Sequence, residues 1–290
     1  MKLLKLFSGS LFLYFLFFST GTQLVSCTPD PIFDTIYVKD TLTIRDTLTI
    51  RDTVDCNCYD LKDGLVAWYN FNGGNLNDSS GKGNHIVFNN ATKTTDRNGK
   101  ANGAYLFDGT NSYMRVANST SLNPQTAITI SAIVKVNGFY AGFCKGNQII
   151  GKQGYDDYTD GYYALRFADY LGDCYTPRDT TRMRFSGAYG NNYGSGGTAA
   201  VTDSFFVKKS TWYNVVYTYG DNESRIYVDG VLIKKSVDPA VFTPNSSDVY
   251  IGKTNNTQYP YFLNGVVDDI RIYNRALCSG EVKQLNRVKD

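Results

Sequence analysis

The polar loop NLNDSSGKGNH, residues 75–85, is the first stretch whose side chains could do chemistry. It comes shortly after the apolar run GLVAWYNF, residues 64–71. Calcium takes about six to eight oxygen ligands from carboxylates, amide side chains and backbone carbonyls. The loop therefore predicts a calcium site that includes Asn75 and Asp78. A phosphate-binding loop is excluded, because Gly83 is followed by asparagine rather than lysine and no helical pattern follows.

Acid–base catalysis has few candidate residues, because the chain has one histidine, His85, and only the glutamates Glu223 and Glu281. A configuration-retaining glycanase needs two carboxyl groups about 5 Å apart. These glutamates belong to a hairpin turn and to the C-terminal segment, so they do not form such a pair. The aspartates of QGYDDYTDG (153–161) are the alternative carboxylates, and a glycan hydrolase that uses them is our third hypothesis. We predict that the protein is not an enzyme.

Three loops between the expected strands combine tyrosines with short polar residues. Sugar rings stack on aromatic faces, and their hydroxyl groups bond to aspartate and asparagine, so a carbohydrate-binding surface is the first hypothesis. Tyrosine also occurs at half-buried sheet positions of a β-sandwich, so these residues need not bind sugar. The second hypothesis is therefore a structural or adhesive protein that binds a protein partner. The predicted ligand-binding residues are Tyr155, Asp156, Asp157, Tyr158, Tyr170, Tyr175, Asn192 and Tyr193.

The segments that must position these loops have the pattern of β-strands. Clusters of Gly, Asn, Asp and Pro separate them, which is typical of an all-β antiparallel sandwich. Asp229-Gly230 predicts a hairpin with a type I′ turn, and only residues 280–290 have a helical pattern. The expected strands are LVAWYNF, AYLFDG, YMRVA, ITISAIVKV, QIIGKQ, YYALRFA, RMRFSG, WYNVVYTYG, SRIYVDGVLIKKS, DVYIGKT and VVDDIRIYN.

Residues 1–26 predict a secretory signal rather than part of the fold, because two lysines precede an apolar core and then small polar residues. The stretch Leu24-Val25-Ser26-Cys27 resembles the bacterial lipobox, which implies that Cys27 carries lipid after cleavage. An ordinary signal peptide with an incidental Cys27 is the alternative. We expect a protein anchored by lipid in the cell envelope, in the outer membrane.

Residues 27–58 contain the repeats DTIYVK, DTLTIR, DTLTIR and DTV, with apolar residues at every second position. A lone strand is not stable in water, so this segment predicts an extended tether, and pairing of copies into a stalk is the alternative. Asp-Thr-apolar resembles an O-glycosylation acceptor of some Gram-negative bacteria, which implies sugar on Thr35, Thr41, Thr47 and Thr53. The jelly-roll domain is then expected at residues 59–290.

The net charge and the cysteine content limit which functions and which disulfides the protein can have. The formal net charge of +2 and the lack of a basic run argue against nucleic-acid binding. An exported protein meets an oxidising compartment, so disulfides are expected. Cys56 and Cys58 have no CxxC spacing or histidine partner for zinc. An odd number of cysteines after Cys27 leaves a free thiol, or a bond to another molecule.

The order of motifs resembles the laminin-G-like, concanavalin A-like jelly-roll domain over residues 61–290. The resemblance implies two antiparallel sheets, with the chain ends on adjacent strands. Where the family binds calcium, an Asp in this loop acts with an Asp near the last strand, which implies that Asp78 meets Asp268 or Asp269. Alternation along the last strand places Asp268 on the core face, where a cation or hydrogen bonds must satisfy it. The motifs are GLVAWYNFNG, NDSSGKGN, GAYLFDGTNSYMRV, ITISAIVKV, WYNVVYTYG, IYVDGVLI, IGKT and VVDDIRIYNRAL.

Cys278 departs from this resemblance, because the family commonly has Ser at the position that caps the final helix, three residues before a Glu such as Glu281. A thiol is a poor cap, which favours a disulfide at Cys278. Since the ends of the implied fold meet, its expected partner is Cys56 or Cys58. A second bridge could join the remaining pair, Cys144 and Cys174.

Overall fold

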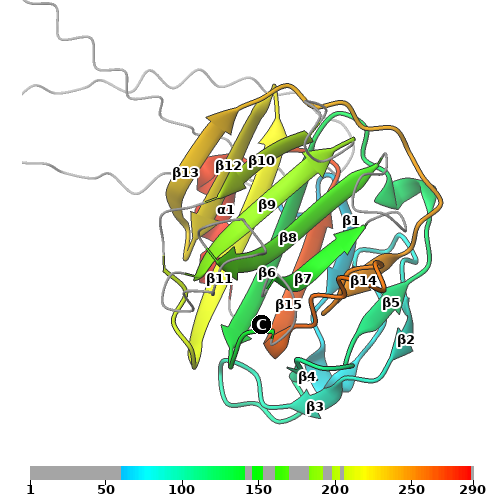
Figure 1. The fold of residues 1–290 in the computed structure, drawn as a ribbon, viewed down its shortest axis with the longest axis vertical. Coiled ribbons are helices and arrows are strands. Elements are labelled where there is room, and N and C mark those ends of the chain that lie inside the picture. Colours follow the sequence, from blue (N-terminus) through cyan, green and yellow to red (C-terminus); the bar gives the residue numbers. More distant parts are fainter. Residues whose placement is uncertain are drawn as a thin grey trace, which may run out of the picture. The chain divides into compact units, whose positions relative to one another are not determined.

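The computed structural model of the chain describes residues 60–140, 146–152, 161–169, 183–191, 198–202 and 206–288. These residues belong to one unit, Tyr59–Asp290. They form two antiparallel β-sheets that lie face to face, with a C-terminal helix (Figure 1). The predicted antiparallel β-sandwich is confirmed. No helix in these ranges is long and apolar enough to cross a membrane.

The first sheet contains the first and last strands of the domain. Its described strands are β1 (Leu65–Tyr69), β3 (Thr92–Thr94), β4 (Ala104–Asp108), β6 (Ile128–Val136), β11 (Thr211–Gly220), β12 (Glu223–Val228), β13 (Val231–Val237) and β15 (Asn264–Tyr273). Their order is β13-β12-β11-β6-β15-β4-β3, and β1 pairs with β15. The two ends of the domain therefore meet on adjacent strands, as the family resemblance implies.

The second sheet covers the inner face of the first. Its described strands are β2 (Ile86–Asn89), β5 (Met114–Val116), β7 (Asn147–Lys152), β8 (Tyr162–Asp169), β9 (Met183–Gly190), β10 (Thr198–Thr202) and β14 (Val249–Ile251), in the order β10-β9-β8-β7-β14-β5-β2. Short 3₁₀ turns lie at Asn72–Gly74 and Thr120–Leu122. The helix α1 (Ser279–Arg287) packs its Val282 and Leu285 against Val216 on the outer face of the first sheet.

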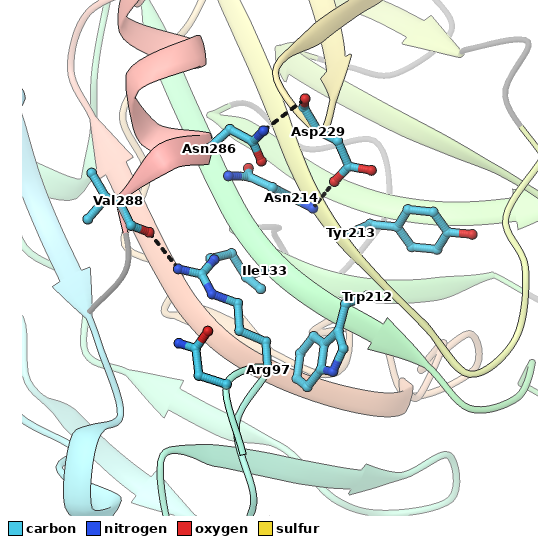
Figure 2. Close-up of a pocket in the computed structure, with 9 residues that line it drawn as sticks. Arg97, Ile133, Trp212, Tyr213, Asn214, Asp229, Asn286 and Val288 are labelled. Carbon is cyan, nitrogen blue, oxygen red and sulfur yellow. Dashed lines mark hydrogen bonds between the residues drawn. The ribbon is translucent and has the colours of Figure 1, made fainter. Parts of the chain in front are cut away.

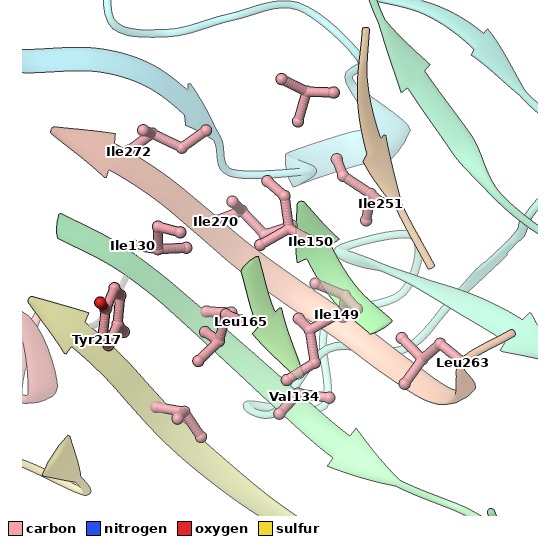
Figure 3. Close-up of a cluster of buried hydrophobic side chains, with 14 of the residues drawn as sticks. Ile130, Val134, Ile149, Ile150, Leu165, Tyr217, Ile251, Leu263, Ile270 and Ile272 are labelled. Carbon is pink, nitrogen blue, oxygen red and sulfur yellow. The ribbon is translucent and has the colours of Figure 1, made fainter. Parts of the chain in front are cut away.

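Alternating apolar side chains of both sheets fill the space between them (Figure 3). Ile130 and Val134 of β6 and Ile270 of β15 meet Ile149 and Leu165 of the second sheet, and all are fully buried. Burial of apolar surface contributes roughly 25 cal/mol per Å². This core holds the sheets in register and fixes which residues of each strand face outward.

Many of the tyrosines are core residues rather than surface residues. Tyr69, Tyr105 and Tyr189 are buried, and their hydroxyl groups donate to the carbonyl oxygens of Asn84, Gly74 and Pro124 at 2.7, 2.8 and 2.9 Å. A buried hydroxyl needs such a partner. The high tyrosine content thus reflects, in part, rings that pack between the sheets while their hydroxyls tie loops to the core.

A β-bulge interrupts β15 between Val267 and Asp269, relative to β6. Val267, Ile270 and Ile272 all belong to the core, so Asp268 is the additional residue at the bulge. The prediction that Asp268 shares the core face with Ile270 and Ile272 is wrong, because an extra residue breaks the two-residue alternation. Asp268 is turned toward the loop that joins β3 and β4.

The predicted hairpin turn is confirmed at Asp229-Gly230, which connects β12 and β13 with φ angles of 51° and 78°. Both angles are positive, as a type I′ turn requires. At the start of α1, the backbone N–H of Cys278 donates to the Glu281 carboxylate at 2.9 Å. Cys278 therefore stands at the N-cap position that the sequence assigns to it.

Candidate functional site

The eight loop residues predicted to bind a ligand lie outside the described residues, so their role stays a prediction. They are Tyr155, Asp156, Asp157, Tyr158, Tyr170, Tyr175, Asn192 and Tyr193. Cys27, the threonines of the repeats and the expected disulfide partners of Cys278 also lie outside, as do Cys144 and Cys174. The lipid anchor and both disulfides likewise stay predictions.

Asp78 is buried at the centre of the polar loop and accepts hydrogen bonds on both carboxylate oxygens. Its Oδ1 accepts from the backbone N–H groups of Trp68 and Ser80 at 2.9 and 2.8 Å. Its Oδ2 accepts from the Ser80 hydroxyl at 2.8 Å and from the Asn84 N–H at 3.0 Å. The ring nitrogen Nδ1 of His85 accepts from the N–H of Asp78 itself. The loop is thus closed on itself and on β1.

Asp269 shares Trp68 as a partner with Asp78, whereas Asp268 does not. Asp269 accepts a hydrogen bond from the Trp68 indole at 2.7 Å and forms an ion pair with Arg271 at 3.1 Å. Asp268 faces Arg97, whose Nε lies 3.7 Å away. Burial raises the pKa of the Asp268 carboxyl to about 7, and Arg97 opposes that rise. Trp68 therefore separates Asp78 from Asp269, and the expected direct meeting with Asp268 is not seen.

The predicted calcium ligands do not fit a cation in this arrangement. A carboxylate has about four lone-pair positions, and the donors around Asp78 take all of them. The side-chain oxygen of Asn75 accepts from the Asn77 N–H at 3.0 Å. In the described ranges, no group of three or more His, Cys, Asp or Glu side chains could hold a metal. Calcium at this loop stays a prediction that needs a direct test.

Both glutamates are occupied by structural contacts. Glu223 forms an ion pair with Arg225 on its own strand, β12, and another with Lys235 on the neighbouring strand, β13. Glu281 accepts from Arg275 at 2.6 and 2.9 Å and caps α1. Both glutamates therefore have a structural role in the described part of the chain.

A pocket of about 270 Å³ lies on the outer face of the first sheet, beside α1 (Figure 2). Alternation along β11 creates it, because Tyr213 and Val215 enter the core whereas Trp212 and Asn214 face outward. We call it the Trp212 pocket. Its lining residues are Arg97, Asn98, Ile133, Trp212, Tyr213, Asn214, Asp229, Asn286 and Val288.

Asn214 is the most unusual residue of the Trp212 pocket. Its side chain is only 5 % exposed, and its Oδ1 has no hydrogen-bond partner among the described residues. A buried acceptor without a partner costs about 1–3 kcal/mol. Its backbone is held by exchange of two hydrogen bonds with Asp229, one to the Asp229 carboxylate at 2.9 Å. The backbone of Asn214 is thus fixed, and its buried side-chain acceptor lacks a partner among the described residues.

Two hydrogen-bond donors of the pocket are engaged within the protein. Arg97 donates to the Val288 carbonyl at 2.7 Å, and Asn286 donates to the Asp229 carbonyl at 3.0 Å (Figure 2). The half-buried Trp212 ring supplies an apolar wall. The exposed Asp229 carboxylate is an acceptor among the lining residues, and it suits a ligand that donates hydrogen bonds.

Sequence reasoning missed this pocket. The run WYNVVYTYG was correctly predicted as a strand, and its alternation already places Trp212 and Asn214 on one face. A tryptophan and an asparagine on the outward face of a strand were the available signal. The contributions of Arg97 and Asn286 could not be seen, because these residues are far apart in sequence and meet only in the fold.

The family described as the concanavalin A-like lectin/glucanases superfamily, in its laminin-G type, matches residues 108–283. No curated protein matches the chain by sequence. Among solved structures, the binding domain of Paraclostridial Mosquitocidal Protein 1 has 16 % identity and a TM-score of 0.58, over 78 % of this chain and 52 % of that one.

Three other similar structures, of two different domains, were determined as complexes. Domain 4 of AbnA, an extracellular arabinanase from Geobacillus stearothermophilus, was solved with arabinotriose; it has 17 % identity and a TM-score of 0.53, over 77 % of this chain and 98 % of that domain. The binding domain of botulinum neurotoxin DC was solved with SialylT (13 % identity, TM-score 0.56) and with rat synaptotagmin II (12 %, 0.57), over 78 % of this chain and 52 % of that one.

This chain spans about half the length of the two toxin domains. At these identities the likeness concerns the fold alone. The sequence match, in contrast, extends over more than half of the chain, from Asp108 to Lys283. The chain belongs to the concanavalin A-like lectin/glucanases superfamily.

Proposed function

We propose that this protein is a non-catalytic carbohydrate-binding protein of the cell envelope, held there by lipid on Cys27, and that the Trp212 pocket binds its ligand. One observation carries the proposal: the buried Asn214 Oδ1 has no hydrogen-bond partner among the described residues and lies beside a half-buried indole. An aromatic wall next to fixed acceptors is the combination that a sugar ring and its hydroxyl groups need.

The charges of the pocket favour a neutral sugar. A hydroxyl group of a sugar can donate to the exposed Asp229 carboxylate. A cationic ligand is disfavoured, because Arg97 lines the pocket and the Lys135 ammonium lies 5.3 Å from the Trp212 ring centroid. An acidic ligand is disfavoured by the Asp229 carboxylate. The volume of about 270 Å³ suits one or two sugar rings rather than a long chain.

The similar structures support a binding role. The AbnA domain, which this chain covers almost entirely, is described with arabinotriose, and the toxin structures are binding domains. The same botulinum domain is also described with a protein, rat synaptotagmin II. A protein partner is therefore the alternative that a binding experiment must separate from a glycan.

A glycan array with the purified full-length protein tests the proposal. We expect a neutral glycan as ligand, and we expect Trp212→Ala to weaken its binding at least roughly tenfold, or about 1.4 kcal/mol. Asn214→Leu should weaken binding as well, while it preserves or raises the melting temperature, because it removes an unsatisfied buried acceptor.

Phe206→Ala is the matched control, because Phe206 is an aromatic residue that is 42 % exposed and does not line the pocket. It should leave glycan binding unchanged. Equal binding by the wild type and by both pocket variants would show that the ligand site lies elsewhere. An array without any hit from folded protein would favour the protein-partner alternative.

A further inference from the structure

The second sheet carries an aromatic patch on its outer face, formed by Phe88, Tyr113, Tyr250 and Phe262 around Lys253. Phe88 and Tyr113 stack with ring centroids 4.7 Å apart, and Tyr113 and Tyr250 are 6.1 Å apart. Phe88 belongs to β2 and is 38 % exposed, and Tyr250 belongs to β14. β2 is the edge strand of the second sheet and β14 is the third strand from that edge, on the side away from α1 (Figure 1).

Lys253 has an unusual environment for an ammonium group. Its Nζ lies 4.6 Å from the Tyr113 ring centroid, 5.3 Å from that of Tyr250 and 5.9 Å from that of Phe262. Among the described residues, it has no carboxylate or other hydrogen-bond acceptor as partner. Partial burial lowers the pKa of this group. An ammonium held this way attracts an anion, because ring faces replace only part of its hydration.

The neighbouring charges leave the patch positive. The Arg115 guanidinium forms an ion pair with Asp248 at 2.6 Å, and the other oxygen of Asp248 accepts from the Asn118 N–H at 2.9 Å. The carboxylate beside the patch is thus committed to Arg115 and to a loop. The aromatic patch thus places a hydrogen-bond donor next to aromatic rings, whereas the Trp212 pocket places an acceptor next to one.

We propose that the aromatic patch binds an acidic sugar, whose carboxylate bonds to Lys253 while an apolar face of the sugar ring lies on Phe88. This inference rests on the proposed glycan-binding function, but it names a second site, on the opposite sheet and for an acidic rather than a neutral ligand. One molecule could then hold a neutral and an acidic glycan on its two faces.

Polygalacturonate and its carboxyl-reduced form are a matched pair of probes, since they differ only in charge. The full-length protein should bind the acidic polymer and not the reduced one, and binding should weaken as salt rises. Lys253→Met, which keeps the apolar stem, should reduce the affinity for polygalacturonate at least roughly tenfold. Phe88→Ala, at an exposed position, should do the same if the Met variant folds poorly.

Lys209→Met is the control, because the Lys209 ammonium also lies over an aromatic ring, that of Phe139 at 5.0 Å, outside the patch. It should bind like the wild type, and so should Trp212→Ala. Equal binding to both polymers, binding to neither, or full binding by Lys253→Met and Phe88→Ala would overturn this inference. Binding of neutral glycans through Trp212 would remain, so the two proposals can fail separately.

Discussion

Asp268 is a buried carboxyl whose surroundings change its protonation. Burial raises its pKa from the ordinary value of 3.8 to about 7, Asp269 and Asp96 add to the rise, and Arg97 opposes it. Between these two pH values the folded protein binds a proton at this site that the unfolded chain releases. The stability that comes from this proton is complete below about pH 4 and is lost as the pH rises to 7.

Asp268→Asn should remove this pH dependence, because the amide keeps an acceptor for the Arg97 N–H but does not ionise. We expect the stability of the wild type, relative to this variant, to fall between pH 4 and 7 and to be constant above pH 8. Urea unfolding of both proteins at several pH values measures the difference. A difference that is independent of pH would mean that Asp268 ionises normally.

At the scale of the elements, most strands could be predicted from the sequence, and the exposure of β2 and β3 explains why these two were missed. The predicted strand ITISAIVKV has the same bounds as β6. Eight of its positions are buried, so its sequence is strongly apolar and easy to recognise as a strand. In β2, Val87 is 55 % exposed and Phe88 is 38 % exposed, so apolar residues do not alternate with polar ones. The sequence TKT of β3 has no apolar residue at all.

The candidate site could be predicted only in part, for a related reason. The outward positions of Trp212 and Asn214 follow from strand alternation, but the pocket also needs the β12–β13 turn and α1 to approach β11. Asn286 reaches Asp229 only because α1 folds back over the sheet. The bulge that turns Asp268 toward Arg97 has no glycine or proline to mark it.

The Asp229-Gly230 turn couples the hairpin to α1, and Gly230→Ala tests this coupling. A Cβ at Gly230 would lie 3.3 Å from the Asn286 Cβ, at a φ of +78°. We expect a loss of stability of about 1–3 kcal/mol, together with weaker glycan binding, because Asp229 and Asn286 line the pocket. Thermal unfolding and the glycan assay measure the two effects.

Gly83→Ala provides the comparison, because Gly83 has the same φ of +78° but nothing within 4 Å of an added Cβ, and it does not line the pocket. It should show only the cost of the backbone conformation and leave glycan binding intact. If Gly230→Ala costs no more than Gly83→Ala, the turn does not press against α1, and the pocket tolerates changes in the hairpin.

At the scale of the whole molecule, the polar loop ties β1 to the rest of the sandwich, either by hydrogen bonds alone or with calcium. Because the lone pairs of Asp78 are occupied by donors, we expect EGTA to leave the melting temperature of the full-length protein unchanged. Asp78→Ala should lower the stability by about 2–4 kcal/mol, since it leaves buried N–H groups without an acceptor.

Asp63→Ala is the control for this measurement. Its side chain is 75 % exposed and pairs with Arg275 at 3.3 Å, so its loss should cost less than about 1 kcal/mol. A drop of several degrees on chelation, reversed by added calcium, would establish the metal site that the sequence predicts and would require Asp78 to exchange its donors for the ion.

The pairing of β1 with β15 also has a mechanical consequence. Arg275 donates hydrogen bonds to the carbonyl oxygens of Asp60 and Asp63, directly before β1. β15 lies inside the first sheet, between β6 and β4. Tension on a chain held at its N-terminal side therefore enters through these clamped residues and passes into the middle of a sheet. A domain loaded in this way can keep its shape while it grips a polymer that is being pulled.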